Sequence, residues 1–156
     1  MGPYDTLRYL ASTRAPGLVF PLHRLLLRLT GGRLLATSGR MPVLLLTTTG
    51  RKTGQPRTWQ LSYLEDDDAL VIVASNSGRE RHPAWYLNLL AEPRATVRIG
   101  GATREVRATV ATPAEKARLW PQLTQAEPLY AAYQHRTTRA IPLVLLHPDS
   151  PHGARG

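Results

Sequence analysis

The sequence predicts a mainly β domain, a small antiparallel barrel of about six strands with helices inserted late in the chain. Short β-prone runs follow one another, with hairpin signals such as Gly100-Gly101 between them. The regular alternation of strand and helix that a doubly wound parallel sheet needs is absent. The length of 156 residues fits one domain with one core.

The charge of the chain is unevenly distributed. The net charge is +9, and residues 1–40, with six Arg and one Asp, contribute more than half of it. Such basicity favours anionic partners, among them phosphate, nucleic acid, acidic lipid and polycarboxylates. There is no cysteine, which excludes disulfides, thiolate nucleophiles and Cys-ligated zinc. The five histidines lack the close helical spacing of a metal-binding pair, so we expect no metal site.

Residues 1–40 form a basic N-terminal extension to the predicted domain, which spans residues 41–148. Within the extension, Pro21 to Leu29 is predicted as a short amphipathic helix with two arginines on one face. This helix either caps one end of the barrel or lies as a basic helix on a membrane surface. Its apolar stretch is too short to cross a bilayer, and residues 149–156 are predicted as a flexible tail.

The first predicted strands form a hairpin. Pro42 to Thr49 is a continuous β-prone run, and Arg57 to Leu64 alternates between two faces. An acidic turn at residues 65–68 leads to a third strand, Ala69 to Ser75. In the second strand one face holds Trp59, Leu61 and Tyr63, and the other holds Thr58, Gln60 and Ser62.

Helices enter after the third strand. Pro83 to Pro93 is predicted as a short helix bounded by its two prolines. Thr112 to Glu115 is a capping box that opens a second helix, with a break expected at Pro121. The other predicted elements are strands at residues 94–99, 106–110 and 141–147 and a further helical piece at residues 127–134.

The turn of the first hairpin carries three cations. Arg51, Lys52 and Arg57 lie within seven residues of one another, spaced by glycine and proline. Glycines let the backbone approach a ligand closely, arginine binds phosphate or carboxylate through two parallel bonds, and lysine adds a point charge. The spacing is not that of a Walker loop, and no helix follows. The turn is therefore either an anion-binding site or a solvated basic β-turn.

A second group of candidate residues follows the third strand. Ser75 belongs to a Gly/Ser loop whose N–H groups are suited to bind anions or ring carbonyls. Trp85 in the next helix either stacks on a planar ring or anchors the helix in the core. Tyr130 and Tyr133 share a helical face, where they either pack the helix on the barrel or roof a ligand cleft. No nucleophile–base pair or carboxylate dyad is evident, which indicates chemistry supplied by a cofactor.

Several segments together resemble the deazaflavin-dependent nitroreductase family. These segments are LLTTTGRKTGQPRT, VIVASNSG, HPAWYLNLLAEP, WPQL and YAAYQHRTTRAIP, in family order and at similar spacing between Pro42 and Pro148. The resemblance implies a split β-barrel related to flavin-binding oxidase barrels. It implies coenzyme F420, a deazaflavin with a phosphate arm and an oligoglutamate tail, as the cofactor. It also implies a reductase that passes a hydride from this cofactor to a quinone, an activated enone or a nitro-heterocycle.

The resemblance further implies roles for individual residues. The hairpin cations grip the phosphate and tail, and the second strand runs along the cofactor. The resemblance places Tyr130 over the ring. Ser75 and Tyr133 are the candidate hydrogen-bond donors that stabilise the charge developing on the acceptor. The implied cofactor-binding residues are Arg51, Lys52, Thr53, Arg57, Thr58, Trp59, Gln60, Leu61, Ser62, Val73, Ala74, Ser75, Asn76, Ala84, Trp85, Tyr86, Leu87, Asn88 and Tyr130.

The acceptor and the partners are less sharply defined. Ser62 and Glu127 stand where some family members carry aromatic residues, which predicts a wider or more polar acceptor pocket. Three alternatives stay open: a non-catalytic deazaflavin- or flavin-binding protein, FMN in place of F420, and a nucleic-acid-binding barrel. The last lacks the row of exposed rings that single strands require, so we expect a small-molecule acceptor and no nucleic acid. We expect a monomer or a homodimer. The resemblance also implies an actinobacterial protein that lies in the cytoplasm or against the inner face of the cell membrane.

Overall fold

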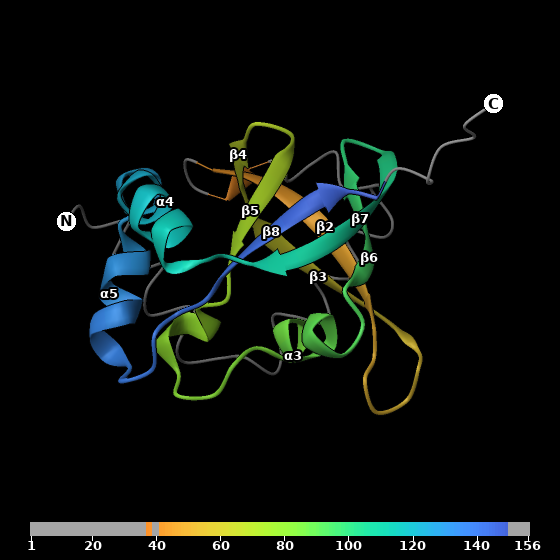
Figure 1. Cartoon of the computed structure of the whole chain (residues 1–156), viewed down its shortest axis with the longest axis horizontal. Helices are drawn as coiled ribbons and strands as arrows, with labels where there is room; N and C mark the ends of the chain where they lie inside the picture. The colour runs from red at the N-terminus through yellow and green to blue at the C-terminus, as the bar shows by residue number, and fades with distance from the viewer. Residues whose placement is uncertain (1–36, 39–40, 150–156) are drawn as a thin grey trace.

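The computed structural model describes residues 37–38 and 41–149, which form one curled sheet flanked by helices (Figure 1). The predicted helix at residues 21–29 and its two interpretations lie outside the described residues. No helix in the described part of the chain is long and apolar enough to cross a membrane. The strands are β1 (Thr37–Ser38), β2 (Met41–Thr49), β3 (Pro56–Ser62), β4 (Leu64–Asp66), β5 (Ala69–Val73), β6 (Arg94–Ile99), β7 (Ala102–Val110) and β8 (Leu143–Pro148). The helices are the 3-10 turn η2 (Asn76–Gly78), α3 (Ala84–Ala91), α4 (Pro113–Ala126) and α5 (Leu129–Arg136).

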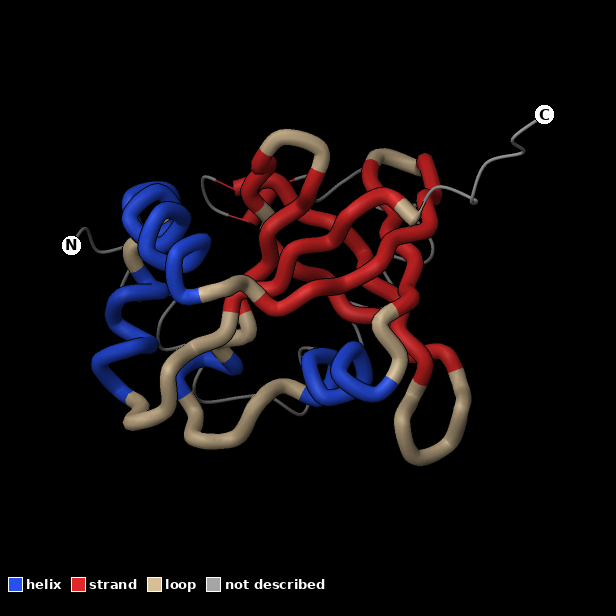
Figure 2. Tube along the Cα trace, in the orientation of Figure 1, coloured by secondary structure: helices blue, strands red, loops and turns tan. Residues whose placement is uncertain are grey.

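All strand pairings are antiparallel, in the order β1-β2-β6-β7-β8-β5-β4, with β3 paired to β2 off this path. Figure 2 shows this sheet curling around an interior, which confirms the predicted mainly β barrel. The short strands β1 and β4 were not among the predicted strands. Strand β7 begins at Ala102 rather than residue 106, because Gly100 and Gly101 form a two-residue turn that pairs the whole of β6 with β7.

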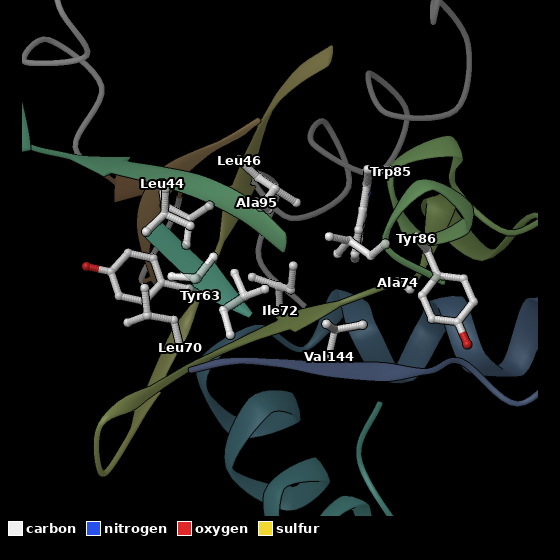
Figure 3. Packing of buried hydrophobic residues seen from close by; sticks show 14 residues of the cluster. Leu44, Leu46, Tyr63, Leu70, Ile72, Ala74, Trp85, Tyr86, Ala95 and Val144 are labelled. Carbon is white, nitrogen blue, oxygen red and sulfur yellow. The ribbon is translucent and has the colours of Figure 1, made fainter. Parts of the chain in front are cut away.

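Two apolar clusters lie on opposite faces of the sheet. The interior cluster includes Leu46, Ile72 and Val144, and Figure 3 shows it packed between the strands and α3. The other cluster includes Val71 and Leu145, together with the buried side chains of α4 and α5. Strands β5 and β8 supply both clusters, which explains why their sequences are continuously apolar rather than alternating.

The capping box of α4 is confirmed, but the expected break at Pro121 is wrong. The Thr112 hydroxyl accepts from the Glu115 amide at 3.2 Å, and the Glu115 carboxylate accepts from the Thr112 amide at 2.7 Å. The helix continues through Pro121 as far as Ala126. Burying the apolar face of α4 against the sheet therefore outweighs the hydrogen bond that proline cannot make.

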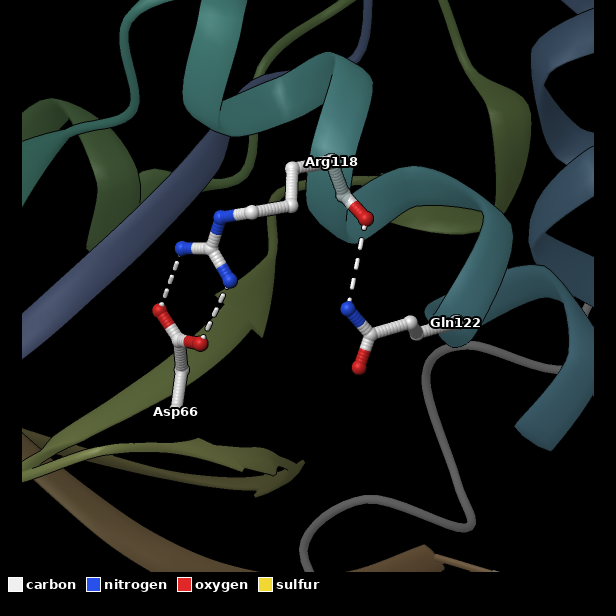
Figure 4. Close-up of polar contacts among 3 residues, drawn as sticks. All are labelled: Asp66, Arg118 and Gln122. Atoms are coloured by element: carbon white, nitrogen blue, oxygen red, sulfur yellow. Dashed lines mark hydrogen bonds and ion pairs between the residues drawn. The ribbon is translucent and has the colours of Figure 1, made fainter.

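An ion pair fixes α4 against the end of β4. Both guanidinium Nη atoms of Arg118 lie 2.7 Å from the carboxylate oxygens of Asp66 (Figure 4). This bidentate contact lowers the pKa of Asp66, first through the hydrogen bonds and then through the charge of Arg118. Gln122 donates to the carbonyl of Arg118 one turn away at 3.3 Å.

The turn η2 lies directly against α5. Gly78 has φ +72°, and a Cβ at this position would lie 2.8 Å from the carbonyl oxygen of Tyr133. Asn76 and Ser77 also have positive φ, at 46° and 56°. Asn76 and Ser77 have side chains and so carry backbone strain in this conformation, which the packing of α5 must offset. The close approach thus joins the end of β5 to the helix that carries Tyr133.

We predict that Gly78→Ala lowers the free energy of unfolding by about 1–3 kcal/mol, because the methyl group meets the α5 backbone in a left-handed conformation. Gly100→Ala is the matched control, since Gly100 has φ +56° and open space around its Cβ position. Chemical denaturation monitored by tryptophan fluorescence measures both. Equal losses in the two variants would show that the contact with Tyr133 contributes nothing.

Candidate functional site

The turn between β2 and β3 is a six-residue loop, residues 50–55, closed by its own backbone. The Gly50 amide donates to the Gln55 carbonyl at 2.8 Å, and the Gly54 amide donates to the Gly50 carbonyl at 2.7 Å. A Cβ on Gly50 would lie 2.9 Å from the Gln55 carbonyl oxygen, so the closure requires glycine there. The loop is therefore a defined structure that presents its side chains to solvent.

The three hairpin cations are exposed, and no carboxylate among the described residues pairs with Arg51, Lys52 or Arg57. A guanidinium nitrogen of Arg57 lies 3.5 Å from the Thr53 hydroxyl, which also accepts from the Gln55 amide at 3.2 Å. Unpaired cations of this kind concentrate positive potential at one end of the barrel. The donor set suits an anionic group with several oxygens, such as a phosphate or a chain of carboxylates.

Asn88 connects this loop to α3. Its side chain is 3% exposed, and its amide nitrogen donates to the Thr48 hydroxyl at 3.0 Å. Its amide oxygen accepts from both the backbone amide and the Nη1 atom of Arg51, each at 3.2 Å. These bonds orient the start of the loop and the Arg51 guanidinium. The predicted contact of Asn88 with the cofactor stays a prediction.

The predicted faces of β3 differ in their surroundings. Trp59 and Leu61 pack against the interior cluster. On the opposite face, the hydroxyl groups of Thr58 and Thr47 are hydrogen-bonded at 2.8 Å. The amide oxygen of Gln60 is buried and has no hydrogen-bond partner among the described residues. A buried acceptor without a partner is costly, and a ligand N–H group would satisfy it.

Four of the predicted site aromatics are buried, and the fifth, Trp59, is partly buried. Trp85 and Tyr86 of α3 belong to the interior cluster, with their rings in an edge-to-face contact at 6.3 Å. They therefore anchor α3 in the core in this structure, as Figure 3 shows. Tyr130 and Tyr133 lie on one face of α5, as predicted, and are buried in the other cluster. Ser75 follows β5 and is 9% exposed.

A cavity of about 350 Å³ opens beside the hairpin, on the side of β6 and β7. It contains none of the predicted site residues. Its lining includes threonine hydroxyls from β2 and the charged residues Arg94, Glu105 and Asp149. One carboxylate oxygen of Asp149 lies 3.9 Å from Nε of Arg94, and the other lies 3.6 Å from Nε of Arg107. The charge of Asp149 is therefore paired with two arginines. Its lining includes neither the hairpin cations nor the Ser75 turn, which is Ser75 together with η2.

The sequence model of the F420H(2)-dependent quinone reductase family matches residues 22–148 of the chain. An F420H(2)-dependent quinone reductase of Mycobacterium tuberculosis is 43% identical over 129 residues, which are 80% of this chain and 87% of that protein. The chain belongs to the F420H(2)-dependent quinone reductase family. The family match includes residues 22–36, a part of the predicted extension that lies outside the described residues.

Two solved structures are similar to this chain. An F420-H2 dependent reductase is 34% identical and superposes with a TM-score of 0.62, covering 68% of this chain and 94% of its own. A domain-swapped dimer is 28% identical with a TM-score of 0.65, covering 94% of this chain and 100% of its own. The expected deazaflavin-dependent oxidoreductase and its split-barrel fold are confirmed. The family found is named for quinones, whereas the resemblance had suggested nitroreductases.

The structure separates the predicted site residues of this quinone reductase family member into two groups. The hairpin and α3 are joined through Asn88, and the Ser75 turn and α5 are joined through Gly78. Arg139, which no sequence argument singled out, contacts the Ser75 turn through its guanidinium. The sequence signal for Arg139 was its place in the segment YAAYQHRTTRAIP. In a sequence alone, however, an arginine between a helix and a strand is expected to be a solvated charge.

We predict that Asn88→Ala lowers the free energy of unfolding by about 1–3 kcal/mol, because it leaves a buried hydroxyl and a loop amide without partners. It should also weaken F420 binding, because the Arg51 guanidinium loses its orientation. The matched control is Leu90→Ala on the same helix, where the side chain is 55% exposed. Denaturation and cofactor titration measure the two effects. Wild-type stability and F420 affinity in Asn88→Ala would show that the hydrogen bonds of Asn88 contribute nothing to the site.

Proposed function

We propose that the protein transfers a hydride from reduced F420 to a quinone, using the hairpin cations to hold the anionic arm of the cofactor. Membership of the F420H(2)-dependent quinone reductase family is the observation that carries this proposal. Among the described residues, the hairpin cations have no carboxylate partner and the buried Gln60 oxygen has no hydrogen-bond donor. Both support the fit, because F420 offers anionic oxygens at one end and ring N–H groups at the other.

In the proposed reaction the cofactor, the hairpin cations and the two hydrogen-bond donors have separate roles. The bound reduced deazaflavin supplies the hydride, and a quinone that accepts it together with one proton becomes the hydroquinone. Arg51, Lys52 and Arg57 bind the arm and so hold the ring in one orientation, which lowers the entropic part of the barrier. The Ser75 hydroxyl and the Tyr133 phenol donate to the oxygen on which charge develops, and water completes the protonation.

A quinone is the proposed acceptor, and nitro-heterocycles and activated enones are the alternatives. Glu127 is buried, with a carboxylate oxygen 3.4 Å from the Leu129 amide at the start of α5. Ser62 is partly buried at the end of β3. Neither supplies the aromatic surface that some nitroreductases have at these positions. Competition between a short-chain quinone and a nitro-heterocycle for the same reduced cofactor ranks the acceptors directly.

A second candidate, F420 binding without turnover, is favoured by one observation. The two proposed donors Ser75 and Tyr133 are only 9% and 7% exposed, so an acceptor has little access to them in this conformation. Stopped-flow mixing of the protein–F420H2 complex with a short-chain quinone separates the candidates. Recovery of oxidised-deazaflavin absorbance supports the reductase, whereas tight binding with no oxidation supports a binding protein.

We predict that Lys52→Ala and Arg57→Ala each weaken F420 binding by about 1–3 kcal/mol while leaving thermal stability unchanged, because each removes a charge-assisted contact from an exposed loop. The loss should shrink as salt is raised, since exposed charges are screened. Arg104→Ala, an exposed arginine on β7, is the matched control. Unchanged affinity in both hairpin variants would make the turn a solvated structure without a ligand.

We predict that Tyr133→Phe slows quinone reduction more than it weakens F420 binding, because it removes a donor that acts only as charge develops. Single-turnover rates and cofactor titration give the two quantities separately. Tyr130→Phe on the same buried face is the comparison variant, and it should affect binding at least as much as rate. Wild-type rate and affinity in Tyr133→Phe would exclude the phenol from the site.

A further inference from the structure

Arg139 lies between α5 and β8 and binds the segment that follows β5. Its Nη2 atom donates to the carbonyl oxygens of Ala74 at 3.1 Å and Ser75 at 2.8 Å. Its Nε atom donates to the Arg79 carbonyl at 2.9 Å, and its Nη1 atom lies 3.2 Å from Nδ1 of His82. One side chain therefore holds three backbone carbonyls and a ring nitrogen of the same segment. Only a planar fork of donors has the geometry to do this.

The charge of Arg139 is not neutralised by an ion pair with any described residue. Glu80 lies near Arg139 in space, but its carboxylate accepts from the amide and hydroxyl of Thr138 at 2.8 and 3.0 Å. Burial lowers the pKa of Arg139, and burial followed by the charge of Arg139 lowers the pKa of His82. Because a guanidinium can only donate, Nδ1 of His82 is the acceptor in its contact with Arg139. The guanidinium is therefore hydrogen-bonded mainly to backbone carbonyls and to no carboxylate among the described residues.

The carbonyl contacts determine where two amide groups point. In a trans peptide the N–H group points opposite to the C=O group of the same peptide unit. Because Arg139 holds the carbonyls of Ala74 and Ser75, the amides of Ser75 and Asn76 are directed to the other side of the chain. The strained backbone that follows, with positive φ from Asn76 to Gly78, needs such external support to persist.

We propose that Arg139 is a positioning residue, which aims the Ser75 and Asn76 amides at the deazaflavin ring. This inference rests on the proposed function, because it assumes that the Ser75 turn borders the ring. Arg139 acts on the ring end of the cofactor, whereas the hairpin cations act on the phosphate end. The two ends can therefore be tested with different ligands.

Arg139→Lys keeps the charge and removes the fork, and Arg139→Gln removes both. Each variant, with Arg81→Gln as an exposed control from the segment that Arg139 contacts, is titrated with oxidised F420 and with the same deazaflavin lacking its phosphate and tail. We expect Arg139→Lys to lose about tenfold in affinity for both ligands, because the ring contacts are common to them. Lys52→Ala should lose affinity for intact F420 alone. Wild-type affinity of Arg139→Lys for the phosphate-free ligand would overturn the inference.

Amide hydrogen exchange tests the clamp without any cofactor. The Gly78 amide donates to the Ser75 carbonyl at 2.9 Å, and the Arg79 amide donates to the Asn76 carbonyl at 3.2 Å. Both should exchange at least roughly tenfold faster in Arg139→Lys, while the Glu127 amide, bonded to Leu123, keeps its rate. Unchanged exchange at Gly78 would overturn the positioning role. Faster exchange in a protein that binds no F420 would overturn the proposed function and support the clamp.

Discussion

The burial of β5 and β8 on both faces is the constraint on which the rest of the structure depends. Each strand contributes alternate side chains to the interior cluster and to the cluster under α4 and α5. Displacing either strand would expose apolar surface on both faces at once, so their ends are held in place. The Ser75 turn continues directly from β5, and its position is a consequence of this packing rather than of its own polar sequence.

The site is built from two regions that are supported in different ways. The hairpin loop is exposed and self-closing, and its only described link to the body is the buried amide of Asn88. The Ser75 turn is partly buried and strained, and Gly78 and Arg139 join it to α5 and the segment that follows. An exposed cationic loop suits capture of a charged arm, because it keeps long side chains in water until the ligand arrives. A clamped turn suits the reacting ring, whose position tolerates little error.

Burial of the aromatic residues changes how the acceptor end of the site is understood. Trp85 and Tyr86 stabilise α3 within the barrel, and this helix in turn carries Asn88 to the hairpin. Tyr130 and Tyr133 hold α5 against β5 and β8. These side chains thus shape the site by placing helices, whatever direct contacts they make with a ligand. Their sequence spacing alone was equally consistent with packing and with ligand binding.

Patterns of period and local chemistry were enough to determine much of this protein from its sequence. The hairpin of β2 and β3, the Gly100-Gly101 turn and the capping box of α4 each follow from a few neighbouring residues. The cations of the hairpin are also a local feature, since their exposure follows from the turn itself. The run of motifs sufficed to indicate the deazaflavin-dependent class of oxidoreductase.

The tertiary structure decided the features that depend on contacts between distant segments. The helix α4 runs through Pro121 because packing on the sheet compensates for a local defect, which no local rule registers. Asn88 reaches back 40 residues to Thr48, and Arg139 reaches back 64 residues to Ser75. A polar side chain in a sequence does not reveal which backbone group it will meet. Only the folded chain shows that Asn88 bonds to the hairpin loop and that Arg139 bonds to the segment after β5.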